Sequence, residues 1–524
     1  MHDLLILDAT LVKGTFENLV DHLDAFLDYR FIFFKHAKEN AEVAGLIKNY
    51  EKLINALEER EMPYAFANEC GLDEYLDTHR HQDQLFIANT PYQNTIISSA
   101  ALLKVTIPIF VFQQINQSTG LAQFQNIQPM TTPYLASKKF GTAGLDFTYL
   151  PKVNILNQVC YFEWHKERYT FRAKKPALDA EGVEGYTFPC PGYPGFRIKI
   201  YKRSISRYEV ERIEKLTRIS DQFPDAALPL AIVYAENDIP VGIAMRDFEG
   251  SELDIYQLHT YQTASKIVIS LIRQLLGLST WGVLHKDLTH NVLCDPQTGE
   301  SHIIDIDSTQ YLDYPAVVSA TDTFNCMPQK YFHNRLFYNT IDLSYSMLMI
   351  VISAFINPDD LFGNYDENGN VQIREEELQN LKRHAPDIYR LVEKAYIQCI
   401  PVSLSEQYAV LTHLETPKTR VYETRHGDSN YGDYPGAPSI EEDPDEFIDL
   451  KLESEDPSLS EEEISFLQKW ILSLFLKNGR TAIAGETDAE RWDRFMREKQ
   501  WVSPLIYVIC SLLAILFILI AIFH

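Results

Sequence analysis

The chain has 524 residues with a formal net charge of −26, and 46% of its residues are hydrophobic. Because this length exceeds what a single core usually supports, we expect two or more domains. The negative charge argues against nucleic acid as a general partner and against docking on anionic membrane surfaces. Seven scattered cysteines without a C-x-x-C pair predict a reducing compartment, with neither a disulfide framework nor a zinc site.

Residues 1–150 are predicted to form an α/β domain, because short apolar runs alternate with helical patterns. Such alternation favours a parallel sheet covered by helices. We expect strands near residues 4–11, 64–68, 85–89 and 106–112, a mostly helical stretch at 16–60 and a helix at 95–104.

The chemistry of this first domain stays open on the sequence. Asp8 ends the first expected strand, which is where α/β proteins place ligands. With Glu69, Asp73 and Asp83 it resembles the acidic set of PIN-type nucleases, which would make the domain a metal-dependent nuclease. The same acids could be helix caps, and the domain could be a non-catalytic sensor or docking module.

Three features follow in chain order between residues 170 and 220. Residues 180–188 include two glycines that would let backbone N–H groups approach phosphate oxygens. Residues 197–201 alternate as a strand and contain a lysine, and residues 208–219 show apolar positions at helical spacing. The residues of interest in these features are Gly182, Gly185, Lys199, Glu209, Glu211 and Glu214.

The most informative pattern is a predicted β-hairpin with acidic motifs at both ends. Residues 285–293 read H-K-D-L-T-H-N-V-L and include Asp287 and Asn291, and residues 305–308 read D-I-D-S. Between them, two short apolar runs flank the turn sequence D-P-Q-T-G. Phosphoryl transfer needs one carboxylate near the attacking hydroxyl and another on the metal, so this pairing of motifs suits that chemistry.

Together these motifs resemble those of the protein-kinase superfamily. The details are similar to bacterial eukaryotic-like Ser/Thr kinases whose lysine strand reads A-K-I-Y and whose metal motif reads D-x-D-S. The resemblance covers residues 170–415 and implies an α+β, two-lobed fold after the α/β domain. It also implies ATP and Mg²⁺ as cofactors and a protein substrate, hence a protein Ser/Thr kinase.

The resemblance implies a role for each motif residue. Asp287 would orient the acceptor hydroxyl, while Asn291 and Asp305 would bind Mg²⁺. Asp307, which replaces the glycine of D-F-G, would add a third carboxylate beside the metal.

The resemblance likewise implies how the nucleotide phosphates would be held. Lys199 would neutralise them and would pair with Glu214, which we choose among the helix acids from its spacing after the lysine. Gly182 and Gly185 would bring backbone N–H groups to the phosphates. Asp342 would be structural, at the start of an apolar helix, where the helix dipole alone would also favour an acid.

Several departures from the family pattern keep a pseudokinase scaffold open as the alternative. Lys286 stands where arginine is usual, and the interval from Asp287 to Asn291 is one residue shorter. Ala180 replaces the first glycine of the loop, and Gln329 replaces the glutamate that ends the activation segment. A further alternative makes the N-terminal domain the effector and the kinase-like domain its regulator.

The last hundred residues have a different composition. Residues 416–463 are predicted to be an acidic flexible linker, and residues 464–500 a short helical juxtamembrane region. Residues 502–523 carry no charge and are long enough for a transmembrane helix in a lipid bilayer. Basic residues between 491 and 499 favour a cytoplasmic N-terminal bulk, so we expect a tail-anchored membrane protein.

Overall fold

The computed structural model describes residues 2–88, 93–116, 118–127, 146, 148–153, 155, 158–173, 185–285, 287–288, 290–312, 314, 316, 327–328, 331, 339–365 and 371–413. The expectations for Gly182, for Lys286, for most of the segment that ends at Gln329 and for residues 416–523 lie outside this part of the chain. Among the helices that are described, none combines the length and the apolar character needed to cross a membrane.

The N-terminal sheet has six strands in the order β3-β2-β1-β4-β5-β6. The first five are parallel to their neighbours, and β6 runs antiparallel to β5, which confirms the predicted parallel α/β layer. One strand, β2, lies within the stretch expected to be mostly helical. The strands are β1 His2–Ile6, β2 Tyr29–Phe33, β3 Tyr64–Phe66, β4 Leu85–Ile87, β5 Ile109–Ile115 and β6 Ala122–Asn126.

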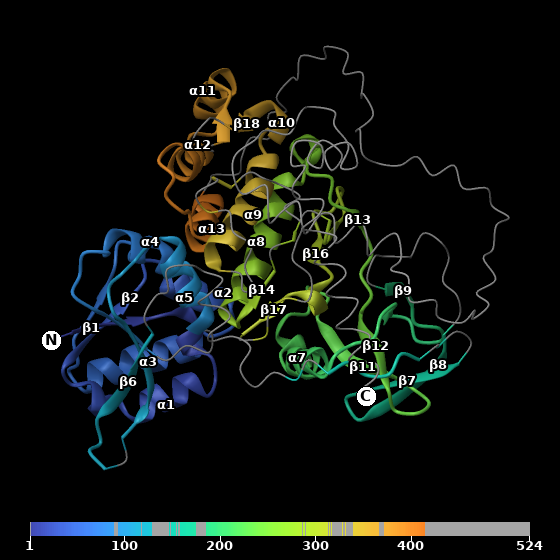
Figure 1. The fold of residues 1–524 in the computed structure, drawn as a ribbon. Helices are drawn as coiled ribbons and strands as arrows, with labels where there is room; N and C mark the ends of the chain where they lie inside the picture. Colours follow the sequence, from blue (N-terminus) through green and yellow to red (C-terminus); the bar gives the residue numbers. More distant parts are fainter. Residues whose placement is uncertain are drawn as a thin grey trace, which may run out of the picture. The chain divides into compact units, whose positions relative to one another are not determined.

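Helices cover both faces of this sheet, because its strands are apolar on both sides. Helices α1 and α3 lie on one face of the sheet, and α4 and α5 lie on the other (Figure 1). Side chains of the first pair pack with Leu4 and Ile6, and those of the second pair pack with Leu5 and Ile87. The helices are η1 Asp8–Leu11, α1 Thr15–Asp21, η2 Leu23–Phe26, α2 Ala37–Val43, α3 Ile47–Glu59, α4 Leu72–Thr78 and α5 Gln93–Leu102.

A second sheet of six antiparallel strands follows, in the order β8-β7-β11-β12-β10-β9. Helix α7 lies against it, with Ile213 packed on Ile232 and Ile243. The elements are β7 Val159–Trp164, β8 Glu167–Arg172, β9 Gly185–Pro189, β10 Phe196–Tyr201, α7 Arg207–Thr217, η4 Ser220–Gln222, β11 Pro229–Ala235 and β12 Pro240–Arg246.

The rest of the described chain is mostly helical and begins with the predicted hairpin. Val292 pairs with Ile303 and Cys294 with Ser301, so the hairpin is confirmed. The two longest helices, α8 and α9, are largely buried in the core of this helical lobe. An antiparallel sheet lobe with one packed helix, followed by a helical lobe that carries the hairpin, agrees with the expected kinase-like fold.

The elements of this lobe are β13 Ser251–Glu252, η5 Leu258–Thr260, α8 Ala264–Thr280, β14 Val283–Leu284, β15 Val292–Cys294, β16 Ser301–Ile303, η6 Ile306–Ser308, β17 Gln310–Tyr311, α9 Thr340–Ser353, α10 Pro358–Leu361, β18 Phe362–Tyr365, β19 Val371–Ile373, α11 Glu375–His384, α12 Pro386–Val392, the π-helix η8 Glu393–Ile397 and α13 Leu404–His413.

The α/β domain and the helical lobe share one hydrophobic core. Leu5 and Ile87 of the N-terminal sheet belong to the same cluster of buried residues as Leu271 and Leu275 of α8. Polar contacts reinforce the junction: the Trp281 ring Nε1 donates to the Ala44 carbonyl at 3.2 Å. The expected boundary near residue 150 is therefore crossed by one shared cluster, while the face of the N-terminal sheet that carries α1 and α3 has a separate cluster of its own.

Candidate functional site

The residues of the predicted catalytic loop lie at the start of the hairpin, and Asn291 forms hydrogen bonds that hold this loop. Its Nδ2 donates to the Asp287 carbonyl at 2.8 Å, and its own carbonyl accepts from the Ile304 backbone N–H at 2.9 Å. These two bonds fix Asp287 relative to the strand that leads into the D-x-D-S motif. The Asn291 side-chain oxygen makes no hydrogen bond among the described residues, so it could bind a metal ion.

At the other end of the hairpin, Asp305 has a left-handed backbone with φ 58° and ψ 34°. Residues other than glycine rarely adopt this conformation, although aspartate tolerates it better than most. Such strain occurs where the surrounding structure needs a particular side-chain direction. Here the carboxylate of Asp305 contacts the ammonium group of Lys199 on β10, across more than a hundred residues of sequence.

Lys199 is almost completely buried, with a side chain only 5% exposed. Strand β10 lies between β9 and β12, which places the lysine in the interior of the sheet. Its Nζ contacts Asp305 and donates to Asp307 Oδ1 at 3.0 Å. The structure thus brings together the predicted phosphate lysine and the predicted metal motif.

Asp307 does not present a free carboxylate to a metal, contrary to the sequence-based expectation. Its side chain is 2% exposed, and Tyr201 donates its hydroxyl to Oδ2 at 2.7 Å while Lys199 donates to Oδ1. Burial alone would raise the pKa of this carboxyl, but Lys199 and Tyr201 hold the pKa below its ordinary value. Asp307 therefore remains charged and serves the lysine.

The expected pairing of Lys199 with Glu214 receives no support from the structure. Glu214 is exposed on α7, and so is Glu211, which contacts Tyr314 and Lys215 instead. Helix α7 begins with a capping box between Ser206 and Glu209, and this start sets which residues face inward. Spacing from the lysine alone could not determine that phase.

Arg212 is the charged residue of α7 that faces the site, and the sequence analysis missed it. The side chain is among the largest that are fully buried, and it donates to the backbone carbonyls of Asp307 and Thr309, the latter at 2.7 Å. Arg212 shares a helical face with the apolar residues Tyr208 and Leu216. That periodicity was the available signal.

Of the two glycines in the expected phosphate loop, Gly185 lies in the part of the chain that the structure describes. Gly185 begins β9, where a Cβ atom would lie 2.4 Å from the Ile200 carbonyl oxygen, so a glycine is needed for β9 to pair with β10. A phosphate contact of Gly185 stays a prediction. Among the described strands, β8 lies at the opposite edge of the sheet from β9.

His285 is a second residue that the site analysis overlooked, although it opens the catalytic motif. The imidazole is buried, which lowers its pKa to about 4, and a hydrogen bond to the Ile304 backbone partly opposes this shift. The ring is therefore neutral near pH 7. It links the catalytic loop to the strand that precedes Asp305.

The N-terminal acids do not form the metal cluster expected of a nuclease. Asp8 accepts from Asn40 at 2.9 Å, Asp73 contacts Thr340 of α9, and Glu69 accepts from Thr78 at 3.0 Å. Asp83 is exposed. Within the described residues, the single group of three potential ligands that come within 4.8 Å contains none of these acids.

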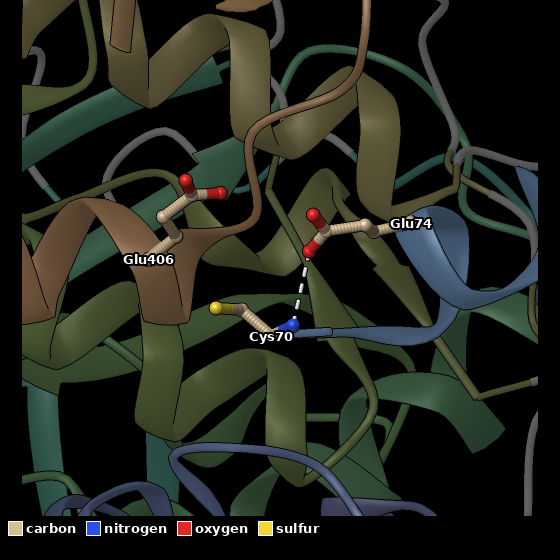
Figure 2. A group of neighbouring side chains, drawn as sticks. All are labelled: Cys70, Glu74 and Glu406. Atoms are coloured by element: carbon tan, nitrogen blue, oxygen red, sulfur yellow. Dashed lines mark hydrogen bonds between the residues drawn. The ribbon is translucent and has the colours of Figure 1, made fainter. Parts of the chain in front are cut away.

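That group consists of Cys70, Glu74 and Glu406, drawn in Figure 2. The Lys394 ammonium donates to Glu74 at 2.8 Å and to Glu406 at 2.7 Å. This ammonium group already supplies the positive charge that a metal ion would bring to the two carboxylates. Burial raises the pKa of the Cys70 thiol to about 12, which keeps it protonated and a poor metal ligand. The group is a link between the α/β domain and the helical lobe.

No family model matches the sequence, and no curated protein matches it. Among solved structures, the chain is similar to a rhoptry kinase from Toxoplasma gondii, with TM-score 0.31 and 11% identity over 49% of this chain and 83% of that one. It is also similar to a Toxoplasma gondii specific rhoptry antigen kinase domain, with TM-score 0.34 and 10% identity over 53% and 89%. TM-scores this low do not by themselves establish a shared fold. Support for the kinase-like fold comes from the order of the elements and from the site itself.

Proposed function

We propose that the chain is an ATP- and Mg²⁺-dependent phosphotransferase of the protein-kinase type, acting on Ser/Thr hydroxyls of protein substrates. The observation that carries the proposal is the contact between the buried Lys199 of β10 and Asp305 at the end of the hairpin. A buried lysine and a metal-type carboxylate on separate lobes have little reason to meet unless both serve one site. Buried charged groups of this kind are enriched at functional sites.

The residues present fit the two cofactors. Bound ATP would supply the γ-phosphoryl group, and Mg²⁺ would neutralise part of the negative charge of its phosphates. Asp305 and the side-chain oxygen of Asn291, which accepts no hydrogen bond from a described residue, offer the hard oxygen ligands that Mg²⁺ prefers. Lys199 would neutralise phosphate charge, and Asp287, held by Asn291, would orient the acceptor hydroxyl and take its proton.

Transfer of labelled γ-phosphate by the full-length protein tests the proposal. Wild type should bind ATP in a Mg²⁺-dependent way and label itself or a protein substrate. Asp287→Asn should abolish transfer and leave ATP affinity within about twofold, because the residue acts on the acceptor. Glu236→Gln, an exposed acid in the β11–β12 turn, is the matched control. Nucleotide binding without any transfer would favour the pseudokinase scaffold instead.

We also propose that residues 502–523 anchor the protein in a membrane, with the N-terminal bulk in the cytoplasm. Support comes from the sequence: an uncharged apolar run of spanning length follows a group of basic residues. Deletion of residues 501–524 should release the protein from membranes and leave ATP binding intact. Full-length protein that washes off in carbonate would contradict this anchor.

A further inference from the structure

We infer that Asp307, and not an acid of helix α7, is the fixed partner that positions Lys199 for the nucleotide phosphates. The inference rests on the proposed function and assigns a positioning role within the same site. Asp307 touches the lysine and none of the reacting groups, so its effect on the chemistry would pass through Lys199.

Asp305 and Asp307 both contact Lys199, but they differ in how easily their carboxylates can move away from it. Asp305 is 34% exposed and lies on a strained left-handed residue, whereas Asp307 is 2% exposed. The Tyr201 hydroxyl holds the second oxygen of Asp307 at 2.7 Å. Asp305 can therefore turn to a metal ion, while Asp307 keeps the ammonium in place.

Asp307 is also fixed through its backbone. The motif forms a 3-10 turn over Ile306–Ser308, and the buried Arg212 of α7 donates to the carbonyl of Asp307 and to that of Thr309. Helix α7 thus supports the lysine indirectly, by holding the main chain that carries its partner. With this arrangement, the lysine needs no partner from the exposed acids Glu211 and Glu214 of α7.

The charges of the site make Asp307 hard to replace. Two cations, Lys199 and Arg212, lie buried beside it, and Asp305 also contacts Lys199. Removing one member of a buried charged set leaves the others uncompensated, which is costly. If Asp305 moved to a metal in the absence of Asp307, the lysine would lose both of these carboxylates.

Binding of ATP and of adenosine to the full-length protein separates positioning from a general structural role. Asp307→Asn keeps the shape and can still accept from Tyr201, but it lacks the charge. We expect its ATP affinity to fall at least about tenfold while adenosine, which has no phosphate for Lys199 to contact, binds as in wild type. Tyr201→Phe should weaken ATP binding less, and Glu236→Gln should change neither affinity.

Thermal unfolding of a double-mutant cycle tests the pair without any nucleotide. Lys199→Met and Asp307→Asn should each lower Tm, since each leaves a buried charge without its partner. The double variant should lose clearly less than the two shifts added together, because residues in contact are not additive.

Two results would overturn the inference. One is an equal loss of ATP and adenosine affinity in Asp307→Asn, or a loss of ATP affinity in Glu214→Gln that matches it. The other is a set of additive Tm shifts in the double-mutant cycle, which would show that Lys199 and Asp307 are not coupled, whatever the nucleotide data show. Wild-type protein that binds no ATP would instead remove the proposed function, and the cycle would still decide whether Lys199 and Asp307 are coupled.

Discussion

Arg212 of α7 donates a hydrogen bond to the Thr309 carbonyl at 2.7 Å and thereby ties the helix of the sheet lobe to the segment that follows the acidic motif. Main-chain carbonyls accept both of these bonds from Arg212, so the bonds depend on the backbone path of that segment. The two lobes therefore meet through a contact that substitution of residues 307–309 would leave available.

Arg212→Met should destabilise the protein by about 2–4 kcal/mol, because two buried carbonyls lose their donor. Arg212→Lys should recover part of this, since one ammonium can reach one of the two acceptors. Urea unfolding measures the effect, with the exposed Arg218→Met at the end of the same helix as control. Equal stability of Arg212→Met and Arg218→Met would contradict the role of this bond.

Asp8 provides a pH-dependent prediction in the α/β domain. Burial raises its pKa to about 6, and the hydrogen bond from Asn40 offsets only part of this. The folded state then binds a proton more tightly than the unfolded state, so the stability associated with Asp8 is greatest below about pH 3.8 and is lost as the pH rises through 6.

Asp8→Asn should therefore stabilise the protein by about 1–2 kcal/mol at pH 7, allowing for its partial exposure, and the gain should fade towards pH 4. The amide can still accept from Asn40. Urea unfolding at several pH values is the measurement, with the exposed Asp21→Asn on α1 as control. A gain that did not change with pH would point to a cause other than titration.

His285 gives the opposite pH dependence. Because burial lowers its pKa to about 4, the unfolded chain takes up a proton that the folded protein refuses. Its contribution is present above about pH 6.5 and is lost as the pH falls towards 4. As the pH falls from about 6.5 to 4, the His285→Gln variant should lose less free energy of unfolding than wild type loses. Parallel pH profiles for the two proteins would show that another group controls acid sensitivity.

Lys394→Met should weaken the junction at Glu74 and Glu406, which are drawn in Figure 2, because the two carboxylates would lose the ammonium group that bonds to both of them. We expect a loss of about 2 kcal/mol, since the three side chains are roughly one-fifth exposed and water would compensate in part. Adding Glu406→Gln should restore some of that loss. If the single variant were as stable as wild type, the ion pairs would not contribute to the junction.

The elements with strong local patterns could be predicted from the sequence. The hairpin from Val292 to Ile303 follows from two apolar runs and one turn sequence, and the strand around Lys199 follows from its alternation. The parallel N-terminal sheet was predicted in type, but the segment Tyr29–Phe33 was assigned to helix because it is short and stands between helical patterns. Local periodicity decides such cases poorly when neighbouring segments dominate the pattern.

The partner of Lys199 could not be predicted, because it depends on the phase of α7 and on a buried turn. Glu214 and Asp307 both lay within the motifs, and only the packed structure separates an exposed acid from one 2% exposed. Contacts between the α/β domain and the helical lobe are even harder to predict from sequence patterns. The bond from Ser405 to Asn40, at 2.9 Å, joins residues 365 positions apart.

Because the α/β domain and the helical lobe share a hydrophobic cluster, we expect them to unfold as one cooperative unit. Backbone amides of β1 and β4 should then exchange with deuterium at rates similar to those of α8, since opening either side exposes the same apolar cluster. Calorimetry should likewise give one unfolding transition for both. Proteolytic removal of residues 1–127 would strip the apolar face from α8, so the remainder would aggregate rather than survive as a separate enzyme.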